Sequence, residues 1–207
     1  MSKAVIILAN GRFPVKGLPL AYLENADRIV CCDGSVSKLI EYGLEPWVIA
    51  GDLDSVPEEV RKKYASRLYH SDDQETNDLT KAVRFCLEEG ITDIVILGAT
   101  GLREDHTLGN ISLLADYAES ISVRMVTDYG IFIPAQPGKA ISSWPGQQIS
   151  IFAVDKGMRI SSTGLKYPLE NMELENWWMG TLNECTDDQF TLDFTNGRVL
   201  VFLEILT

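Results

Sequence analysis

Basic residues are scarce in this chain of 207 residues, which has 18 lysines and arginines against 30 aspartates and glutamates and a formal net charge of −12. Surfaces that bind nucleic acids or anionic membranes carry excess positive charge, so this composition argues against both as partners. A nucleotide substrate stays compatible with such an acidic chain, because a divalent metal can bridge carboxylates to phosphates.

Long apolar runs are also absent. The run that begins at Ala4 is too short for a signal peptide, and no small-residue cleavage site follows it. No stretch reaches the roughly 18 apolar residues of a membrane-spanning helix. The few cysteines form neither a C-x-x-C pair nor the pattern of a disulfide framework; they are Cys31, Cys32, Cys86 and Cys185. We therefore expect a cytoplasmic protein whose thiols are structural.

The first part of the chain alternates short apolar runs with helical patterns. The runs, each a predicted strand, are Ala4–Ala9, Arg28–Cys32, Trp47–Ala50, Arg67–His70, Ile94–Leu97 and Val123–Val126. The segments predicted as helices are Val36–Tyr42, Pro57–Tyr64, Asp78–Glu89 and Leu108–Glu119. This alternation is typical of a mostly parallel sheet that is covered on both faces, so we expect an α/β domain over residues 1–130.

Turn signals come in quick succession after residue 130. Strand-like segments lie between them at Gln148–Val154, Met158–Ser162, Phe190–Phe194 and Val199–Ile205. The dipeptide Asn196-Gly197 separates the last two of these segments and predicts a β-hairpin. We expect a smaller all-β domain over residues 131–207.

Polar residues gather where four of the predicted strands end. The clusters are Asp33-Gly34-Ser35, Gly51-Asp52-Leu53-Asp54-Ser55, Gln74-Glu75-Thr76-Asn77-Asp78 and the segment from Gly98 to His106. Ligands of open α/β sheets bind in the crevice outside the carboxyl ends of the strands. The four clusters are therefore expected to converge on one site.

The residue types in these clusters favour a metal–phosphate site. Asp52 and Asp54 share a face in an extended segment, and several carboxylates in one cleft repel each other unless a cation lies between them. Hard oxygen ligands suit magnesium, which also takes phosphate oxygens. Gly98 and Gly101 would let the backbone approach a polyphosphate, and Arg103 offers a planar fork for phosphate oxygens.

Single residues of the set also have purely structural interpretations. Asp33, Asp54 or Asp78 alone could be the N-cap of a helix. His106 fits a structural hydrogen-bonding role better than that of a catalytic base. A shared metal–phosphate site explains the set as a whole better than separate caps do.

Three ordered motifs resemble those of the thiamine pyrophosphokinase family. They are Gly51-Asp52-Leu53-Asp54-Ser55, Gln74-Glu75-Thr76-Asn77-Asp78 and Gly98-x-x-Gly101-x-Arg103-x-Asp105-His106-x-x-x-Asn110. A later segment, Gly164-Leu165-Lys166-Tyr167-Pro168-Leu169, is similar to the signature of the family's second domain. Together the motifs cover most of the chain in the order that the family shows.

The resemblance implies an enzyme that transfers the diphosphoryl group of ATP to thiamine, releases AMP and uses Mg²⁺. It implies a Rossmann-like α/β domain that carries ATP and metal, then a β-sandwich that helps to build the thiamine pocket at the interface of a homodimer. The implied catalytic residues are Asp52, Asp54, Asp78, Arg103 and Asp105, of which Asp52, Asp54 and Asp105 are the expected metal ligands. The expected nucleotide-binding residues are Asp33, Gly34, Asn77, Gly98, Gly101, His106 and Asn110.

The expected acceptor-binding residues are Trp177, Trp178 and Asn183. A tryptophan ring could stack on a flat or cationic heterocycle, or it could instead plug a loop or anchor a dimer. Leu182 stands where the family often has a serine, and leucine offers no hydroxyl group.

Three alternatives remain open at this point. A metal-dependent phosphatase would also use an Asp-x-Asp sequence after a strand, but it needs a lysine aimed at the site, and Lys81 within a predicted helix is a poor candidate. A nucleotide sensor would bind ATP without forming AMP. A pyrophosphokinase for another heterocyclic alcohol stays possible because of Leu182.

Overall fold

The computed structural model describes residues 4–206. The chain divides into two compact units. The α/β unit holds the chain up to Leu113 together with Tyr117–Asp128, and the β unit holds Leu114–Asp116 and the chain from Tyr129 onward. No helix in the described part of the chain is long and apolar enough to cross a bilayer.

Six parallel strands form the sheet of the α/β unit, in the order β6-β5-β1-β2-β3-β4. Their bounds are β1 Val5–Leu8, β2 Ile29–Cys32, β3 Val48–Gly51, β4 Leu68–His70, β5 Asp93–Leu97 and β6 Ser122–Val126. The central strands β1, β2 and β3 are buried along their whole length, as expected for strands covered on both faces. Every strand predicted for this part of the chain is confirmed to within about one residue at each end.

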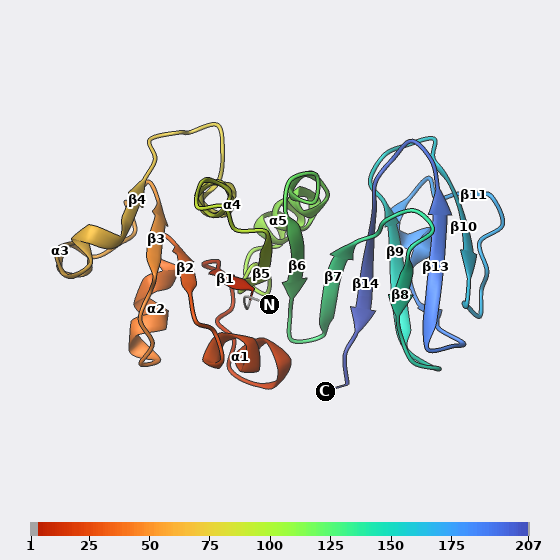
Figure 1. Ribbon diagram of the computed structural model, residues 1–207, viewed down its shortest axis with the longest axis horizontal. Coiled ribbons are helices and arrows are strands. Elements are labelled where there is room, and N and C mark those ends of the chain that lie inside the picture. Colours follow the sequence, from red (N-terminus) through yellow and green to blue (C-terminus); the bar gives the residue numbers. More distant parts are fainter. Residues whose placement is uncertain (1–3, 207) are drawn as a thin grey trace. The chain divides into compact units, whose positions relative to one another are not determined.

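Helices cover both faces of this sheet. Their bounds are α1 Gly17–Glu24, α2 Ser35–Glu41, α3 Glu58–Lys63, α4 Asp78–Glu88 and α5 Glu104–Tyr117, with a 3₁₀ turn η1 at Ala65–Arg67. Helices α1 and α2 lie on one face, whereas α4 and α5 lie on the other (Figure 1). Right-handed crossovers give this arrangement, because the chain moves from β1 towards β4 and then returns to β5 on the other side of β1.

Two of the helices differ from the sequence prediction. Helix α1 was not predicted, because its apolar residues are spread around the helix rather than along one stripe and Pro19 lies in its first turn. Helix α5 begins at Glu104, four residues before the predicted start at Leu108. Glu104 and Asp105 are therefore in its first turn, where negative side chains interact favourably with the helix dipole.

Two antiparallel sheets of four strands form the β unit, in the orders β12-β9-β14-β7 and β11-β10-β13-β8. The bounds are β7 Gly130–Pro134, β8 Ala140–Ser142, β9 Gln148–Ala153, β10 Arg159–Thr163, β11 Met172–Glu173, β12 Asn183–Glu184, β13 Gln189–Phe194 and β14 Val199–Glu204, and a 3₁₀ turn η2 spans Trp177–Gly180. Both sheets contribute to one apolar core, with Ile151 and Val201 from the first and Ile160 and Leu192 from the second. The predicted fold class, an α/β domain followed by a β-sandwich, is confirmed.

The predicted hairpin at Asn196-Gly197 is wrong. The chain does turn there, and Asn196 takes the left-handed conformation with φ 55°. However, β13 pairs with β10 and β8, whereas β14 pairs with β7 and β9, so the turn leads from one sheet of the sandwich to the other. The dipeptide determines the local reversal, but burial of the alternating apolar side chains decides which strands pair.

Candidate active site

A cavity of about 400 Å³ opens at the carboxyl ends of the strands of the α/β unit. Its walls come from the segments that follow β1, β2, β3, β4 and β5 and from the first turns of α4 and α5. The predicted site residues among its lining are Asp33, Asp52, Asn77, Asp78, Arg103, His106 and Asn110. The strand order reverses at β1, and open α/β sheets bind ligands at this kind of switch point.

Asp33 is a deeply buried carboxylate at the end of β2, only 5% exposed. Its Oδ2 accepts a hydrogen bond of 3.2 Å from the backbone N–H of Ser55. Its Oδ1 is buried and has no hydrogen-bond partner within residues 4–206. Burial raises the pKa of Asp33, the bonds from Ser55 oppose this effect, and the nearby charges of Asp78 and Asp52 raise the pKa further. The site thus holds an acceptor oxygen that the described protein leaves unused.

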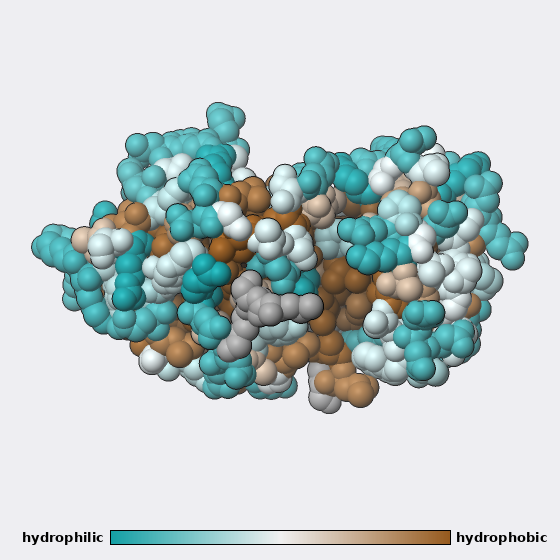
Figure 2. Space-filling view, viewed as in Figure 1, coloured by the Kyte–Doolittle hydropathy of each residue, from teal (hydrophilic) through white to brown (hydrophobic). Residues whose placement is uncertain are grey.

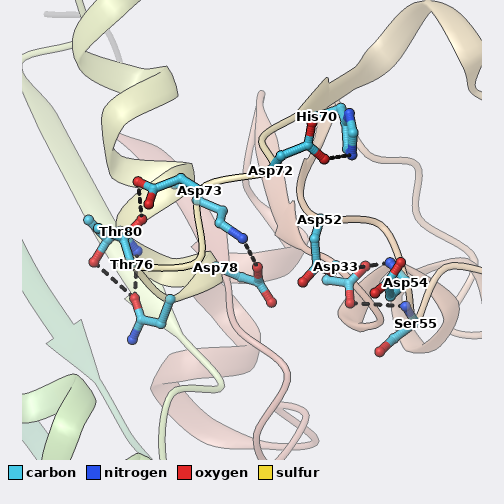
Figure 3. Close-up of polar contacts among 12 residues, drawn as sticks. Asp33, Asp52, Asp54, Ser55, His70, Asp72, Asp73, Thr76, Asp78 and Thr80 are labelled. Carbon is cyan, nitrogen blue, oxygen red and sulfur yellow. Dashed lines mark hydrogen bonds and ion pairs between the residues drawn. The ribbon is translucent and has the colours of Figure 1, made fainter.

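Glycine at position 51 allows the carboxylates to pack closely. Gly51 ends β3 with φ 154°, and a Cβ atom there would lie 3.1 Å from both the Cβ of Asp33 and the Oδ1 of Asp78. Figure 3 shows the side chains of Asp33, Asp52 and Asp78 directed into the same space. Oδ1 of Asp52 accepts the backbone N–H of Asp54 at 3.1 Å, but Asp54 itself is exposed and lies outside the cavity lining.

The first turn of α4 contributes an N-cap, a carboxylate and a lysine. Asn77, predicted to bind nucleotide, is the N-cap of this helix, because its Oδ1 accepts the backbone N–H of Thr80 at 2.9 Å. Asp78 follows as the first helical residue, and its Oδ1 accepts a bond of 3.3 Å from Nζ of Lys81. Lys81 lines the cavity and is 2% exposed. The sequence-based judgement that Lys81 is poorly placed for the site is therefore wrong.

Arg103 and Asp105 form a surface pair at the start of α5. The guanidinium group of Arg103 donates to both carboxylate oxygens of Asp105, with its Nε 3.0 Å from Oδ1. These bonds, together with the backbone N–H of His106, lower the pKa of Asp105 to about 2. Arg103 and His106 line the cavity, whereas Asp105 lies just outside the lining.

The segment after β1 was not among the predicted site segments, although the polar residue Asn10 follows that strand as polar residues follow the others. Asn10 and Gly11 both line the cavity. The N–H of Gly11 donates to the carbonyl of Gly98 at 2.7 Å, and a Cβ atom on Gly11 would lie 2.3 Å from that oxygen. Gly98 and Gly101 have φ of 65° and 85° and belong to the facing loop, which Asn110 holds through a bond of 2.9 Å from its Nδ2 to the carbonyl of Ala99.

The donor set fits a hard divalent cation, although the protein provides few ligands. Within residues 4–206, no group of three or more histidine, cysteine or acidic side chains is arranged so that it could hold a metal ion. Magnesium keeps several waters and takes substrate phosphates as ligands, so one or two carboxylates are enough. The orphaned Oδ1 of Asp33, next to Asp52 and Asp78, is the feature of this structure that fits such a cation.

The β unit carries an aromatic surface on the sheet formed by β12, β9, β14 and β7. The ring centroids of Phe132 and Phe202 are 4.8 Å apart, and Phe152 packs edge-on against Trp177 at 5.6 Å. Figure 2 shows apolar surface over β7 and β14. The indole N–H of Trp177 donates to the carbonyl of Ala153 at 3.0 Å, so this ring is anchored in place.

Trp178, Leu182 and Asn183 differ sharply in their exposure to solvent. Trp178 is 73% exposed and Leu182 is 72% exposed, and Leu182 takes the left-handed conformation with φ 58°. Asn183 is buried, and its side-chain amide bonds both backbone groups of Tyr167. Its Nδ2 donates to the carbonyl of Tyr167 at 2.7 Å, and its Oδ1 accepts the N–H of Tyr167 at 3.2 Å. The described contacts of Asn183 are thus those of a residue that holds the loop around Tyr167.

Comparisons with known proteins agree with this architecture and confirm the resemblance found in the motifs. Residues 20–125 match the family model described as thiamin pyrophosphokinase, catalytic domain, and residues 130–202 match thiamin pyrophosphokinase, substrate-binding domain. Thiamin pyrophosphokinase 1 of Caenorhabditis elegans is 30% identical over 89% of this chain and 85% of its own length. Thiamine pyrophosphokinase of Bacillus subtilis is 27% identical over 96% of this chain and 97% of its own. The crystal structure of thiamine pyrophosphokinase from Bacillus subtilis superposes with a TM-score of 0.81 at 25% identity, covering 99% of this chain and 100% of that one. The comparisons give no support to the phosphatase or the nucleotide sensor, and the chain belongs to the thiamine pyrophosphokinase family.

Proposed function

We propose that this protein transfers the terminal diphosphoryl group of ATP to the hydroxyl group of thiamine, giving thiamine diphosphate and AMP. The observation that carries the proposal is the cavity in which three carboxylates face Arg103 and Lys81, in a chain whose two parts match both domains of the family. The carboxylates, Asp33, Asp52 and Asp78, suit a site for the polyphosphate of a nucleotide with its cation.

The side chains of the cavity divide the work between charge neutralisation and positioning. Arg103 keeps guanidinium N–H groups beyond the two that bond Asp105, and these can bind phosphate oxygens. Asp33, Asp52 and Asp78 would hold Mg²⁺, directly or through water. Bound there, Mg²⁺ would offset charge on the phosphate oxygens. Asp54 and Asp105 stay predicted ligands, and each lies next to a residue of the cavity lining.

Transfer of this kind is mostly positioning and charge stabilisation, because the acceptor oxygen must approach phosphorus in line with the leaving AMP. Asn77, His106 and Asn110, which line the cavity, are placed to bind the nucleotide. The glycines at 34, 98 and 101 shape the loops against which its phosphates would lie.

The acceptor is proposed to bind through the β unit, and the protein is proposed to act as a homodimer. The exposed ring of Trp178 supports both proposals, because an aromatic face attracts the cationic ring of thiamine and an exposed aromatic surface suits an interface. Trp177, which is anchored by its bond to Ala153 and packs against Phe152, would extend this aromatic surface. Asn183 would act through the loop that it holds.

Product analysis tests the proposal. The purified protein is incubated with ATP, Mg²⁺ and thiamine, and AMP and thiamine diphosphate are followed by chromatography. Both products should appear in equal amounts and only when thiamine is present. Asp52→Asn and Asp54→Asn should reduce turnover by about 100-fold or more without changing the fold. Asp188→Asn, which alters an exposed carboxylate of the β unit, is the matched control.

Release of inorganic phosphate without an acceptor, or binding of ATP without any AMP, would contradict the proposal. Near-normal AMP release by Asp54→Asn would remove only that residue from the mechanism. Sedimentation equilibrium measures the proposed dimer separately.

A further inference from the structure

The side chain of Lys81 is the most deeply buried cation of the cavity. It belongs to the buried face of α4, whose other buried members are apolar: Leu79, Ala82, Val83, Phe85 and Cys86. Its ammonium group reaches the cavity lining, where it lies beside Asp78. A buried ammonium group is costly unless it is well paired, so its presence on this face requires an explanation.

The pairing that the described protein provides is weak. Within residues 4–206, Asp78 is the ion-pair partner of Lys81, and the distance between Nζ and Oδ1 is 3.3 Å. Strong charge-assisted bonds between an ammonium and a carboxylate are about 2.7–2.9 Å long. An ammonium group has three N–H donors, and one loose bond leaves capacity for a further acceptor. A methionine would fill the same space with no charge to bury, so packing alone does not account for the lysine.

The second positively charged side chain of the cavity has a different position. The side chain of Arg103 is 73% exposed and is already bonded to Asp105 through two nitrogens. Lys81 is therefore the cation at the buried end of the cavity, next to Asp78 and across Gly51 from Asp33. The orphaned oxygen of Asp33 marks the same end as the place where a ligand or its cation would fit.

We propose that Lys81 is a substrate-binding residue whose ammonium group donates hydrogen bonds to the terminal diphosphoryl group of the bound nucleotide. This inference depends on the proposed function, because that function requires the diphosphoryl group to lie among these carboxylates. A lysine at this end of the cavity would neutralise charge on the outer phosphate oxygens, and so supplement the charge that a bound cation would supply there. Asp78 then positions Lys81 in addition to any role towards the cation.

Binding of ATP and of AMP to Lys81→Met tests the inference without relying on turnover. Titration calorimetry in the presence of Mg²⁺ should show ATP binding about 10- to 100-fold more weakly than to the wild type, the range expected for a lost bond to a charged group. Binding of AMP, which lacks the terminal diphosphoryl group, should change less than about twofold. Lys81→Arg should recover part of the affinity for ATP, because it keeps the positive charge.

A matched control lies one turn further along the same helix. Arg84 pairs with Asp73 at 3.1 Å, its side chain is 42% exposed, and it lies outside the cavity lining. Arg84→Met therefore removes a paired cation from α4 and should leave the affinity for ATP unchanged. A loss of equal size in this control would show a general effect of charge and overturn the inference.

The double variant Lys81→Met with Asp78→Asn covers the case in which Lys81→Met fails to fold, because it removes both members of the pair. Compared with Asp78→Asn alone, it should still bind ATP about 10-fold more weakly. Equal affinities would mean that Lys81 acts only through Asp78, and the inference would fall. Unchanged ATP affinity in a folded Lys81→Met, or equal losses for ATP and AMP, would also overturn it.

Kinetics separate this inference from the proposed function. In Lys81→Met the KM for ATP should rise and kcat should fall, while the KM for thiamine stays the same. If the wild type makes thiamine diphosphate but Lys81→Met binds ATP normally, only the inference fails. If the wild type makes no thiamine diphosphate but binds ATP through Lys81, the proposed function fails instead.

Discussion

Replacement of Asp33 by asparagine is expected to make the protein more stable and less active. Asp33 is buried, its Oδ1 has no hydrogen-bond partner in the described chain, and its backbone takes a left-handed conformation with φ 41°. Asparagine tolerates that conformation well and keeps an oxygen for the N–H of Ser55. Its amide nitrogen would replace the orphaned oxygen and could donate to the carboxylates of Asp52 or Asp78.

The size of the effect follows from the unused oxygen. Leaving a buried acceptor unsatisfied costs about 1–3 kcal/mol, and the neighbouring carboxylates add repulsion. We expect the free energy of unfolding to rise by about 1–2 kcal/mol when no divalent cation is present. For a chain of this length that corresponds to an increase of about 2–8 °C in Tm.

The pH dependence has a definite sign. Burial raises the pKa of Asp33 in the folded protein above its unfolded value, which is close to 3.8. The folded wild type therefore binds the proton more tightly than the unfolded chain does, and it loses stability as the pH rises from 3.8 through the folded pKa. The advantage of Asp33→Asn should be full above the folded pKa and should vanish as the pH falls towards 3.8.

Thermal unfolding in EDTA between pH 4 and pH 8 measures this difference, with Asp188→Asn as a control for the loss of one exposed carboxylate. Added Mg²⁺ with ATP should raise the Tm of the wild type and have little effect on Asp33→Asn, whose turnover should be at least about 100-fold lower. An Asp33→Asn protein that is less stable than the wild type at pH 8, or equally favoured at pH 4 and pH 8, would refute the reasoning.

Two further substitutions test single features of the two units. Gly51→Ala should destabilise the α/β unit by about 1–3 kcal/mol and abolish ATP binding. The added Cβ atom would lie only 3.1 Å from the side chains of both Asp33 and Asp78 and would push them away. Calorimetry that finds normal affinity for ATP would contradict this close packing. Leu182→Asn should raise the free energy of unfolding by about 1 kcal/mol, because leucine is strained at φ 58°. A drop in the denaturant midpoint of this variant would show instead that the leucine side chain stabilises the fold by packing.

The strands of the α/β unit could be predicted from the sequence because most of them are short apolar runs, whereas helix α1 has no apolar stripe that would have predicted it. The strand pairing of the β unit could not be predicted. Asn196 and Gly197 determine a turn, yet the partners of the two flanking strands depend on contacts with β7, β8, β9 and β10, which are remote in sequence. Strands β8, β11 and β12 are so short that their apolar pattern is not distinguishable from that of a loop.

The candidate site shows the same division between local and remote information. Strand ends rich in carboxylates correctly indicated which segments converge. Lys81 was missed because a helix interior was taken to exclude it, although a lysine three residues after Asp78 lies on the same face of the helix as that aspartate. Its burial depends on how α4 packs against β2 and β3, which the helical pattern alone does not specify.

The conformational cost of this site is concentrated at the ends of two neighbouring strands. Asp33 after β2 and Leu53 after β3 are non-glycine residues with positive φ, of 41° and 67°, and Gly51, the last residue of β3, has φ 154°. Such conformations persist only where the surrounding structure enforces them. Here the enforcing contacts are the fully buried central strands and the bond from the N–H of Ser55 to Asp33. The carboxylates of Asp33, Asp52 and Asp78 lie close enough to repel one another, and a bound cation with its polyphosphate would offset that repulsion. Selection for the most stable fold would have removed this arrangement, so its presence is itself an argument that the carboxylates act together on a ligand.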